Sequence, residues 1–583
     1  MELHIGRVVT LGAALVALGS AATPPSAAAV PAGYPDYDHA MQQLRELAQN
    51  ERAELFSIGV TATGAGIPVL IVGGDGHDKV PAIAVVGDTG GAHAGVPTVI
   101  GMARELLDRL DQPAQAELPA ELAYYFIPLP SPDAYSRLFE QPPAERQVNA
   151  RPADEDFDFL VDEDGFEDLN GDGLITLMRV ARDGGSQRTH PADSRVLISA
   201  DAAKGELGEY DVFSEGVDND GDGLFNEDPP GGVDFSRNFT FNYPYFQVGA
   251  GPHQVSEPET RAVADFLFDH PNIAMVLSFS PEENLAHPWK PGDTKGGQRT
   301  GIDGRDEPVF DHMSKLYREL LPEESGVLDA PDPDWGEGSF VEWAYFHYGR
   351  WSLAARPWWP AEPPKSEEEK TPDSAEDGSE QRDDSTEPIE DVGNRGKDDL
   401  RLLAWNDYAS AGRFAPWEAV DHPDFPGKLV EVGGFSPFAD ALPPAEKLPE
   451  LASLHTGLLL ELAGLLPKLK LELADQEHRG DGVYRLEVKA INLGYLPTVS
   501  ALGEESDLLY PLQYTLALPD RAQLLDGRLR SRLSPLAGGG GSQTIIWLID
   551  APDGGEVMIT IYSPSVGRAE LTLNLNESGV HDE

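Results

Sequence analysis

The stretch "PAIAVVGDTGGAHAGVPTVIG" (residues 81–101) passes from an apolar run through a glycine-rich turn into a segment with helical spacing. The apolar run predicts a buried strand, and the continuation "PTVIGMARELLDRL" predicts a helix. A histidine, His93, stands between the two, where open α/β sheets place their ligands. The stretch therefore predicts an α/β sheet with a candidate site at the carboxyl end of this strand.

Strand-like and helix-like segments alternate on both sides of this stretch. "AELFSIGV", "GIPVLIVGG", "LAYYFIPLP" and "NIAMVLSFS" are apolar or β-branched runs, and "DYDHAMQQLRELAQN" has helical spacing. "SEPETRAVADFLFDH" opens with Ser256 and Glu259, the spacing of a capping box, which predicts a helix that starts after Ser256. This alternation predicts an α/β domain over residues 35–465, with a mixed, mostly parallel sheet flanked by helices.

Two other parts of the chain have a different texture. Residues 361–399 hold many acids and almost no apolar side chains, so they cannot bury enough surface to fold, and we expect a disordered acidic insert. From residue 468 to 583, apolar and polar residues alternate in four segments separated by turn residues: "VYRLEVKAINLGYLPT", "SQTIIWLID", "EVMITIYSP" and "RAELTLNL". They predict a small all-β sandwich domain.

Charge and composition restrict the partners. The formal net charge is -57, from 100 acids and 43 bases, which argues against binding to nucleic acid or anionic lipid. Without cysteines, a metal site must use His, Asp, Glu or carbonyl ligands. After the N-terminal region no apolar run is long enough for membrane insertion. Residues 1–29 combine Arg7, an apolar run and the small residues Ala27 and Ala29, which predicts a signal peptide and an exported, periplasmic or extracellular protein.

Acidic loops between residues 150 and 230 predict calcium as a cofactor. "DLNGDG" and "DNDGDG" have the D-x-[DN]-x-D-G register, which directs alternate oxygens at one centre and places a glycine at the sharp turn. Neither loop has a glutamate at its twelfth position, so neither is an ordinary EF-hand. A third stretch, with Asp154, Asp156 and Asp158, has Phe159 in place of the glycine and is a weaker candidate. The predicted calcium ligands are Asp168, Asn170, Asp172, Asp218, Asp220, Asp222 and Asp228.

The chain from about residue 35 to 465 resembles the M14 zinc carboxypeptidases, most of all the large secreted bacterial members with D-x-D-x-D-G insertions. "GAHAGV" resembles the H-x-x-E metal motif, "SPDAYSR" resembles N-P-D-G-Y, and "GVDFSRNF" resembles D-x-N-R-N-F. "SEPETRAVADFL", "MVLSFSPEENLAHP" and "GSFVEWAYFHYGRWSLAARPWWP" follow in the family's order. The resemblance implies a metallopeptidase fold, zinc as a cofactor and hydrolysis of peptides at their carboxyl end.

The family's metal and catalytic residues are mostly replaced. His93 matches the first zinc ligand, but Val96 and Ser280 stand at the other two ligand positions. Arg356 stands at the position of the catalytic glutamate, and no acid occurs from Trp351 to Ala361. Catalytic zinc needs three protein ligands and an acid that shuttles the proton of its water. We therefore expect no catalytic residues, and His93 as the remnant of a zinc site.

In the family's substrate-carboxylate clamp, the Asn-Arg pair becomes Ser236 and Arg237. A guanidinium fork suits a carboxylate because it meets both oxygens. The favoured reading is an inactive member of the family, a pseudoenzyme, that binds a peptide or protein carboxyl terminus in the former cleft. One alternative is an active zinc carboxypeptidase with ligands relocated among Asp88, His93, Glu282, Glu283 and His287. Another is a calcium-stabilised exported scaffold. Ligand and oligomeric state are left open.

Overall fold

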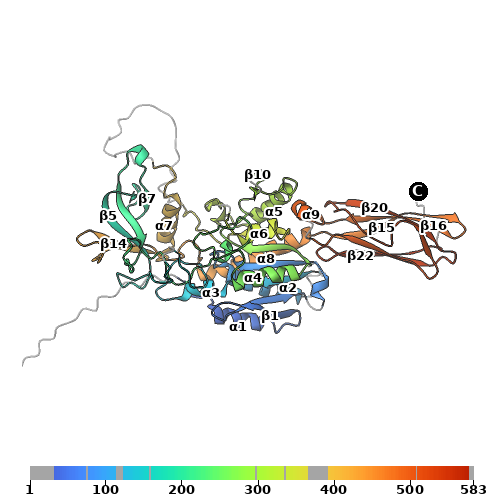
Figure 1. The fold of residues 1–583 in the computed structure, drawn as a ribbon, viewed down its shortest axis with the longest axis horizontal. Helices are drawn as coiled ribbons and strands as arrows, with labels where there is room; N and C mark the ends of the chain where they lie inside the picture. Colours follow the sequence, from blue (N-terminus) through green and yellow to red (C-terminus); the bar gives the residue numbers. More distant parts are fainter. Residues whose placement is uncertain are drawn as a thin grey trace, which may run out of the picture.

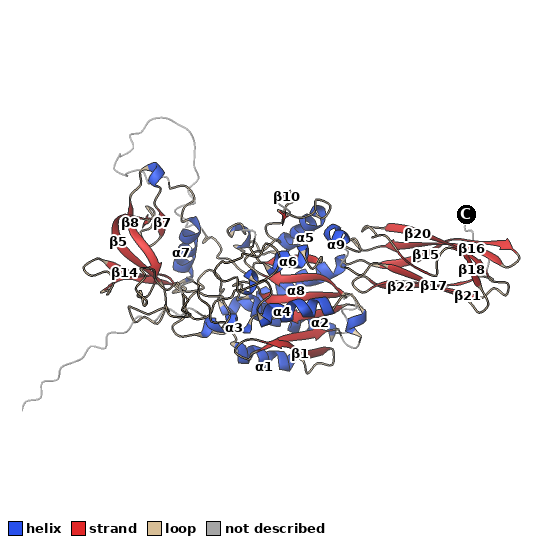
Figure 2. Cartoon of the chain, viewed as in Figure 1, coloured by secondary structure: helices blue, strands red, loops and turns tan. Residues whose placement is uncertain are grey.

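The computed structural model describes residues 30, 32–73, 76–112, 122–155, 159–295, 298–333, 336–364, 392–506 and 509–576. The chain forms an elongated molecule with a central α/β unit, a second sheet at one end and a β-sandwich at the other (Figure 1). Most helices gather around the central sheet, whereas both ends consist mainly of strands (Figure 2). The predicted signal peptide of residues 1–29 lies outside the described residues.

The central sheet has six strands in the order β1-β2-β4-β3-β9-β12. Their bounds are β1 Ala53–Val60, β2 Gly66–Val72, β4 Ala123–Ile127, β3 Ala82–Asp88, β9 Ile273–Phe279 and β12 Trp351–Ala355. The β4-β3, β3-β9 and β9-β12 pairs are parallel, and the β1-β2 and β2-β4 pairs are antiparallel. Every residue of β3, β9 and β12 is buried, as expected for strands covered on both faces.

The helices follow the strands as crossover connections and cover the sheet. Their bounds are α1 Tyr37–Leu47, α2 Gly95–Leu110, α3 Pro132–Ser136, α4 Pro258–Asp269, α5 Glu307–Leu320, α6 Phe340–Phe346 and α8 Leu448–Leu465. Helix α8 packs on α2 and α5, whereas α4 packs on β1 and α6 on β12. The chain runs from β3 to its neighbour β4 and then returns to β9 on the other side of β3. The gap between β3 and β9 is therefore the switch point of the sheet, where such folds form their sites.

The start of α4 differs from the predicted capping box. The N-cap of α4 is Glu257, its side chain makes no capping bond, and Pro258 is the first helical residue. The Ser256 hydroxyl instead donates to Glu257 Oε1, 2.6 Å away, and Glu259 accepts a bond from Asn149. Proline suits the first helical position because its missing N–H has no partner there, so it begins the helix one residue later than the S-x-x-E pattern requires.

A second sheet, which the sequence analysis did not predict, joins two distant parts of the chain. Its order is β13-β14-β5-β8-β6-β7, and all its pairings are antiparallel. The strands are β13 Phe414–Val420, β14 Val430–Phe435, β5 Leu177–Gly185, β8 Gly208–Ser214, β6 Gln187–Thr189 and β7 Leu197–Ser199. Met178, Val180, Val430 and Val432 form its small core. The insertion of residues 150–230 is thus held by strands from beyond residue 410.

The predicted acidic insert of residues 361–399 is described only at its ends, because residues 365–391 lie outside the described part of the chain. At its carboxyl end the prediction of disorder is wrong, since helix α7 (Lys397–Ala409) begins inside the predicted range. Leu402 and Leu403 of α7 are buried, and Leu403 packs with Val196 and Ile198 of the second sheet. Packing of these apolar residues therefore stabilises a helix that also includes the last three residues of the predicted insert.

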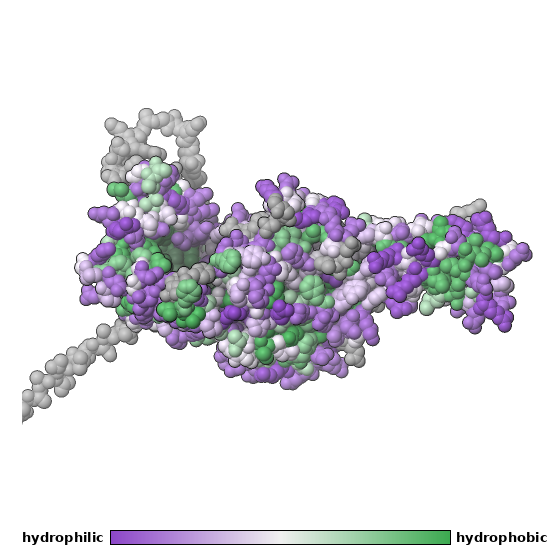
Figure 3. All heavy atoms as spheres, viewed as in Figure 1, coloured by the Kyte–Doolittle hydropathy of each residue, from purple (hydrophilic) through white to green (hydrophobic). Residues whose placement is uncertain are grey.

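The C-terminal domain is a sandwich of two four-stranded antiparallel sheets, β15-β16-β20-β18 and β19-β17-β21-β22. The strands are β15 Leu469–Gly480, β16 Val483–Asn492, β17 Gln513–Ala517, β18 Gln523–Asp526, β19 Arg530–Arg532, β20 Gly541–Asp550, β21 Glu556–Ser563 and β22 Gly567–Asn574. Trp547 is fully buried between the sheets. Figure 3 shows apolar residues gathered on the outer surface of this domain, and Leu525, Leu529 and Ile546 are about half exposed.

The remaining elements are the hairpin of β10 (Thr294–Lys295) and β11 (Gln298–Arg299), and helix α9 (Ala501–Ser506). Helix α9 fastens the sandwich to the α/β unit, because Asp306 accepts the backbone N–H of Ala501 and Arg305 pairs with Glu504 and Glu505. The predicted fold class, a mixed α/β unit followed by a β-sandwich, is confirmed. Among the described residues, no helix has the length and apolar character needed to cross a membrane.

Candidate functional site: the former zinc cleft

His93 lies in the turn between β3 and α2, beside the carboxyl end of β9. Its side chain is 1% exposed, and its Nδ1 shares a short hydrogen bond with Asp88 Oδ2. Thr89 N donates to the Phe279 carbonyl at 2.9 Å, which ties the end of β3 to the end of β9. The structure therefore places His93 at the switch point that the sequence predicted.

Aromatic side chains pack against the His93 ring. The Phe438 ring stands edge-on to the imidazole, with centroids 5.1 Å apart, and Tyr135 lies 6.4 Å away. Val96, at the second ligand position, is buried in the first turn of α2. Phe438 follows β14 in the chain and has a positive φ of 60°, a costly conformation for a bulky residue. Sequence reasoning missed Phe438, and no local pattern marks it.

Ser280, at the third ligand position, is fully engaged within the protein. Its hydroxyl donates to the Thr89 carbonyl at 3.0 Å and accepts from the Glu282 backbone N–H at 3.1 Å. Ser280 is also fully buried. One imidazole bound to an aspartate, a valine and an occupied hydroxyl cannot supply three zinc ligands. The residues present at this centre do not fit zinc.

The relocated ligand set does not come together either. Glu283 is buried and turned into its own loop, where it accepts the backbone N–H groups of Leu285 and Ala286. His287 Nδ1 lies 2.5 Å from Glu283 Oε1, so these two side chains satisfy each other. Within the described residues, the only cluster of three or more His, Asp or Glu ligand atoms within 4.8 Å of one another lies elsewhere, in the loop after Val217.

Arg356 occupies the end of β12, where the family has its catalytic glutamate. Its Nη2 donates to the Pro281 carbonyl at 3.0 Å, and its guanidinium carbon lies 5.2 Å from the centre of a Trp359 ring. Burial lowers the pKa of Arg356, and the charges of Glu283 and Asp440 oppose this shift. A guanidinium held in this way carries a positive charge and accepts no proton, so it cannot act as a general base.

Three carboxyl groups, of Asp234, Glu282 and Glu342, lie beside Ser236 and Ser339, and only Glu282 among them was named from the sequence. Burial raises the pKa of Asp234 to about 6 and that of Glu282 to about 7. Burial, followed by the charge of Glu282, raises the pKa of Glu342 to about 9. Ser339 Oγ donates to Glu282 Oε2 at 2.5 Å, and Ser236 Oγ lies 3.5 Å from the same oxygen. At neutral pH Glu342 therefore keeps its proton, Glu282 is about half protonated and Asp234 is mostly ionised.

Arg237, in the short turn η4 (Phe235–Arg237), is partly exposed to solvent. Its side chain is 35% exposed, its Nη2 donates to Gln247 Oε1 at 3.0 Å, and Glu337 Oε2 lies 3.9 Å away. Its Nε is buried without a hydrogen-bond partner in the described structure. Gly249 and Gly338 pack beside it with positive φ, and a Cβ at Gly338 would lie 2.3 Å from the Arg237 carbonyl oxygen.

The loop after η4 places aromatic side chains beside Arg237. It contains Gln247, the partner of Arg237, between Phe246 and Val248. Phe246 is 89% exposed and has a positive φ of 61°, while Tyr245 is also exposed and accepts a bond from Gln254. Exposed aromatic residues therefore adjoin, in the sequence, the glutamine that binds Arg237.

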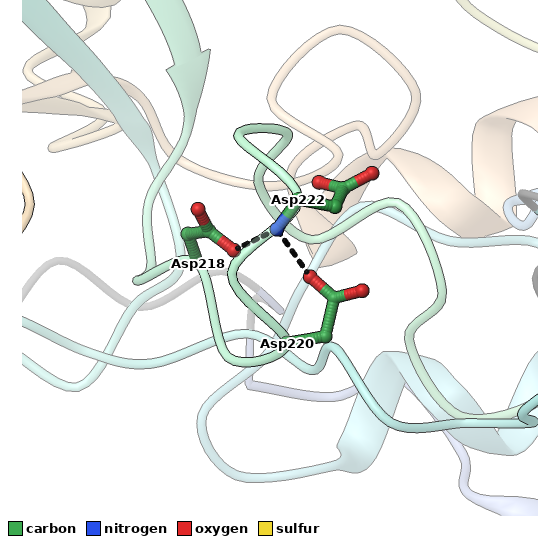
Figure 4. Close-up of side chains that lie close together, drawn as sticks. All are labelled: Asp218, Asp220 and Asp222. Atoms are coloured by element: carbon green, nitrogen blue, oxygen red, sulfur yellow. Dashed lines mark hydrogen bonds between the residues drawn. The ribbon is translucent and has the colours of Figure 1, made fainter.

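The two acidic loops adopt the same conformation. In the second loop, Asp218 accepts the N–H groups of Gly221, Asp222 and Gly223, and Asp220 accepts that of Asp222 (Figure 4). In the first loop, Asp168 accepts from Gly171, Asp172 and Gly173, and Asn170 from Asp172. Asp218, Asp220 and Asp222 form the cluster with ligand atoms within 4.8 Å.

Each loop is braced by a fully buried carboxylate that precedes the other loop in the chain. Glu215 accepts the N–H groups of Leu169 and Thr176, the second and ninth residues of the first loop. Asp164 accepts those of Asn219 and Asn226, the second and ninth residues of the second loop. The braces are therefore exchanged between the loops.

Two other predicted calcium positions stand apart from the cluster. Asp228 is fully buried, and its Oδ1 accepts the N–H of Glu155 at 2.8 Å, so it lies outside the group of three. In the weaker third stretch, Asp154 accepts the N–H of Phe159, whereas Asp156 and Asp158 lie outside the described residues. The sequence analysis named neither Asp164 nor Glu215, because nothing in the loop motif indicates a distant brace.

Comparison with known proteins gives the family. The sequence model of the zinc carboxypeptidases matches residues 39–356, more than half of the chain, and the chain belongs to this family. A second model, of a domain of unknown function, matches residues 468–574, which correspond to the sandwich. No curated protein matches the chain. The predicted family membership is confirmed.

Solved structures that resemble the chain are metallocarboxypeptidases. Carboxypeptidase A from Helicoverpa armigera has 12% identity and a TM-score of 0.33, over 55% of this chain and 63% of its own. Bovine thrombin-activatable fibrinolysis inhibitor, in complex with tick carboxypeptidase inhibitor, has 11% identity and a TM-score of 0.33, over 74% and 96%. The Burkholderia cenocepacia metallocarboxypeptidase has 11% identity and a TM-score of 0.29, over 55% and 59%.

Proposed function

We propose that this chain is a non-hydrolytic member of the zinc carboxypeptidase family that binds the carboxyl terminus of a peptide or protein in the former cleft. The observation that carries the proposal is Arg237, whose side chain is 35% exposed and whose Nη2 is bound to Gln247. A terminal carboxylate would take the two terminal nitrogens of the guanidinium as a bidentate pair and displace Gln247. The exposed ring of Phe246 would cover an apolar side chain of the same ligand.

The proposed absence of hydrolysis is supported by the residues around His93. Val96 offers no lone pair, the Ser280 hydroxyl is occupied, and Phe438 packs against the imidazole. Arg356 replaces the acid that would move a proton. Binding energy in this cleft is therefore proposed to serve recognition of a chain end and not the cleavage of a bond.

Binding should be measured by calorimetry with a pair of peptides that end in an aromatic residue, one with a free carboxylate and one amidated. The proposal expects binding of the first only, weakened at least about tenfold in Arg237→Gln, since a hydrogen-bonded charge pair contributes about 1.5–3 kcal/mol. Arg479→Gln is a matched control, because Arg479 is an exposed arginine of the sandwich. Equal binding of both peptides, or no effect of Arg237→Gln, would contradict the proposal.

The same preparation should be tested for peptidase activity on that free peptide with added zinc. Release of the terminal residue, abolished in His93→Ala and proportional to bound zinc, would instead establish the active carboxypeptidase. The cleft residues favour no release. Binding and hydrolysis are measured in separate assays, so a negative result in one assay leaves the other interpretable.

A second candidate is a calcium-stabilised scaffold whose sandwich makes the useful contacts. The observation that favours it is the pair of braced acidic loops, in which three carboxylates already face one another. Calcium bound there would stiffen the second sheet, because β8 ends at Ser214, just before the second loop. This candidate expects calcium to raise the melting temperature while the free-carboxylate peptide fails to bind. Both proposals include the predicted export of the chain. Sequencing the N-terminus of the mature protein tests this prediction.

A further inference from the structure

A cavity of about 600 Å³ lies away from Arg237, between the end of α5, the segment after β12, α7 and the start of α8. In Figure 1, α7 stands between the second sheet and the central α/β unit. The volume falls in the range of small-molecule sites, about 300–1,000 Å³. The cavity lies near the former catalytic position, because the Arg356 guanidinium lies over Trp359, which lines it.

Aromatic rings form much of the cavity wall. Trp358, Trp359, Trp405 and Tyr408 all line it, and the Trp358 and Trp405 rings stand edge to face with centroids 5.2 Å apart. Tyr408 is exposed. Trp359 is only 5% exposed, and its indole N–H has no hydrogen-bond partner in the described structure. The cavity therefore offers a ligand aromatic surface on this side.

The charged residues of the lining are four glutamates and one lysine. Lys447 is paired with Glu450, with Nζ and Oε2 3.1 Å apart. Glu323, Glu324 and Glu362 are exposed at the rim, and none of them forms an ion pair with another described residue. The cavity thus combines aromatic rings with three glutamates that form no ion pair with a described residue, within a protein of net charge -57.

We propose that this cavity binds an organic cation, an alkylammonium or guanidinium group attached to an apolar body. The cation would lie against the Trp358 and Tyr408 rings, because the guanidinium groups of Arg356 and Arg413 already lie over the Trp359 and Trp405 rings. The rim glutamates would attract it. An anion meets repulsion from the three glutamates, and a neutral ligand gains nothing from them. The site shares no residue with the carboxylate-binding proposal for Arg237.

Three probes of similar size separate these cases by calorimetry on the full chain: benzyltrimethylammonium, benzyl alcohol and 3-phenylpropionate. The expected result is saturable binding of the ammonium probe alone, which weakens as salt is added. Trp358→Ala and Tyr408→Ala should each reduce its affinity about fivefold, the scale of one exposed cation–π contact. Trp358→Phe should retain part of the affinity, which shows that a change of fold is not the cause.

Glu323→Gln combined with Glu324→Gln should weaken the ammonium probe and flatten its salt dependence. Matched controls are Tyr510→Ala, an exposed tyrosine of the sandwich, and Glu319→Gln, an exposed glutamate of α5 outside the cavity. The proposal is overturned by equal binding of the three probes, by binding that the cavity variants leave unchanged, or by no heat from the ammonium probe up to about 10 mM.

Discussion

Replacing Glu342 by glutamine should stabilise the protein, and increasingly so as the pH rises. Glu342 is 2% exposed, its Oε1 accepts the N–H of Gly336 at 2.9 Å, and its Oε2 has no partner among the described residues. Burial and the neighbouring Glu282 raise its pKa from the model-compound value of 4.5 to about 9. The folded protein therefore keeps a proton on Glu342 that the unfolded chain releases above pH 4.5.

A raised carboxyl pKa makes stability fall with rising pH, because the unfolded state binds fewer protons than the native state in this window. Each pH unit above 4.5 costs about 1.4 kcal/mol, so at pH 7 the penalty is on the order of 3 kcal/mol. Glutamine keeps the bond to Gly336 and cannot ionise. The stability difference between Glu342→Gln and the parent should grow from near zero at pH 4.5 to about 3 kcal/mol at pH 7.

The assay is denaturant unfolding of both proteins from pH 4.5 to 8, followed by tryptophan fluorescence. Glu319→Gln serves as the control, because that glutamate is exposed and should give a small difference without a pH trend. A difference for Glu342→Gln that is constant with pH, or that favours the parent at pH 8, would refute the argument.

Three further outcomes follow from the site. Binding of a peptide carboxylate should weaken from pH 5.5 to 8, because Asp234 and Glu282 ionise in this range and compete for Arg237. Their pKa values are about 6 and about 7. Titration calorimetry of Glu282→Gln should show an affinity that depends less on pH. Calcium should raise the melting temperature of EDTA-treated protein by several degrees, and Asp218→Asn with Asp220→Asn should remove much of this gain, whereas Asp553→Asn in the sandwich should not. Mass-spectrometric metal analysis after zinc dialysis should find well below one zinc per chain; a full equivalent held by His93 would contradict the account of the cleft.

Much of the central sheet could be predicted because its signals are local. The strand predicted at "AELFSIGV" is β1 (Ala53–Val60), and the apolar runs that became β3 and β9 are continuous because both faces of these strands are covered. The second sheet has no such signal. Its β5 pairs with β14, which places Val180 opposite Val430 across 250 residues of chain, and a local pattern does not specify such a partner.

The candidate site divides in the same way. The order of the family motifs located His93, Val96, Ser280 and Arg356, since each lies at the end of a predicted element. The side chain that packs against His93 could not be predicted, because Phe438 comes from a loop more than 300 residues later. The protons held by the cleft acids arise from burial, which only the folded structure determines.

The exchange of braces between the acidic loops makes the insertion indivisible. Deleting the segment with the first loop would also remove Asp164, and deleting the segment with the second would remove Glu215, so the surviving loop would lose its anchor in either case. During evolution, such an insertion could be gained or lost only with both loops together. Relatives are therefore expected to carry both loops or neither, and a natural sequence that keeps one loop should have changed the residue that once supported it.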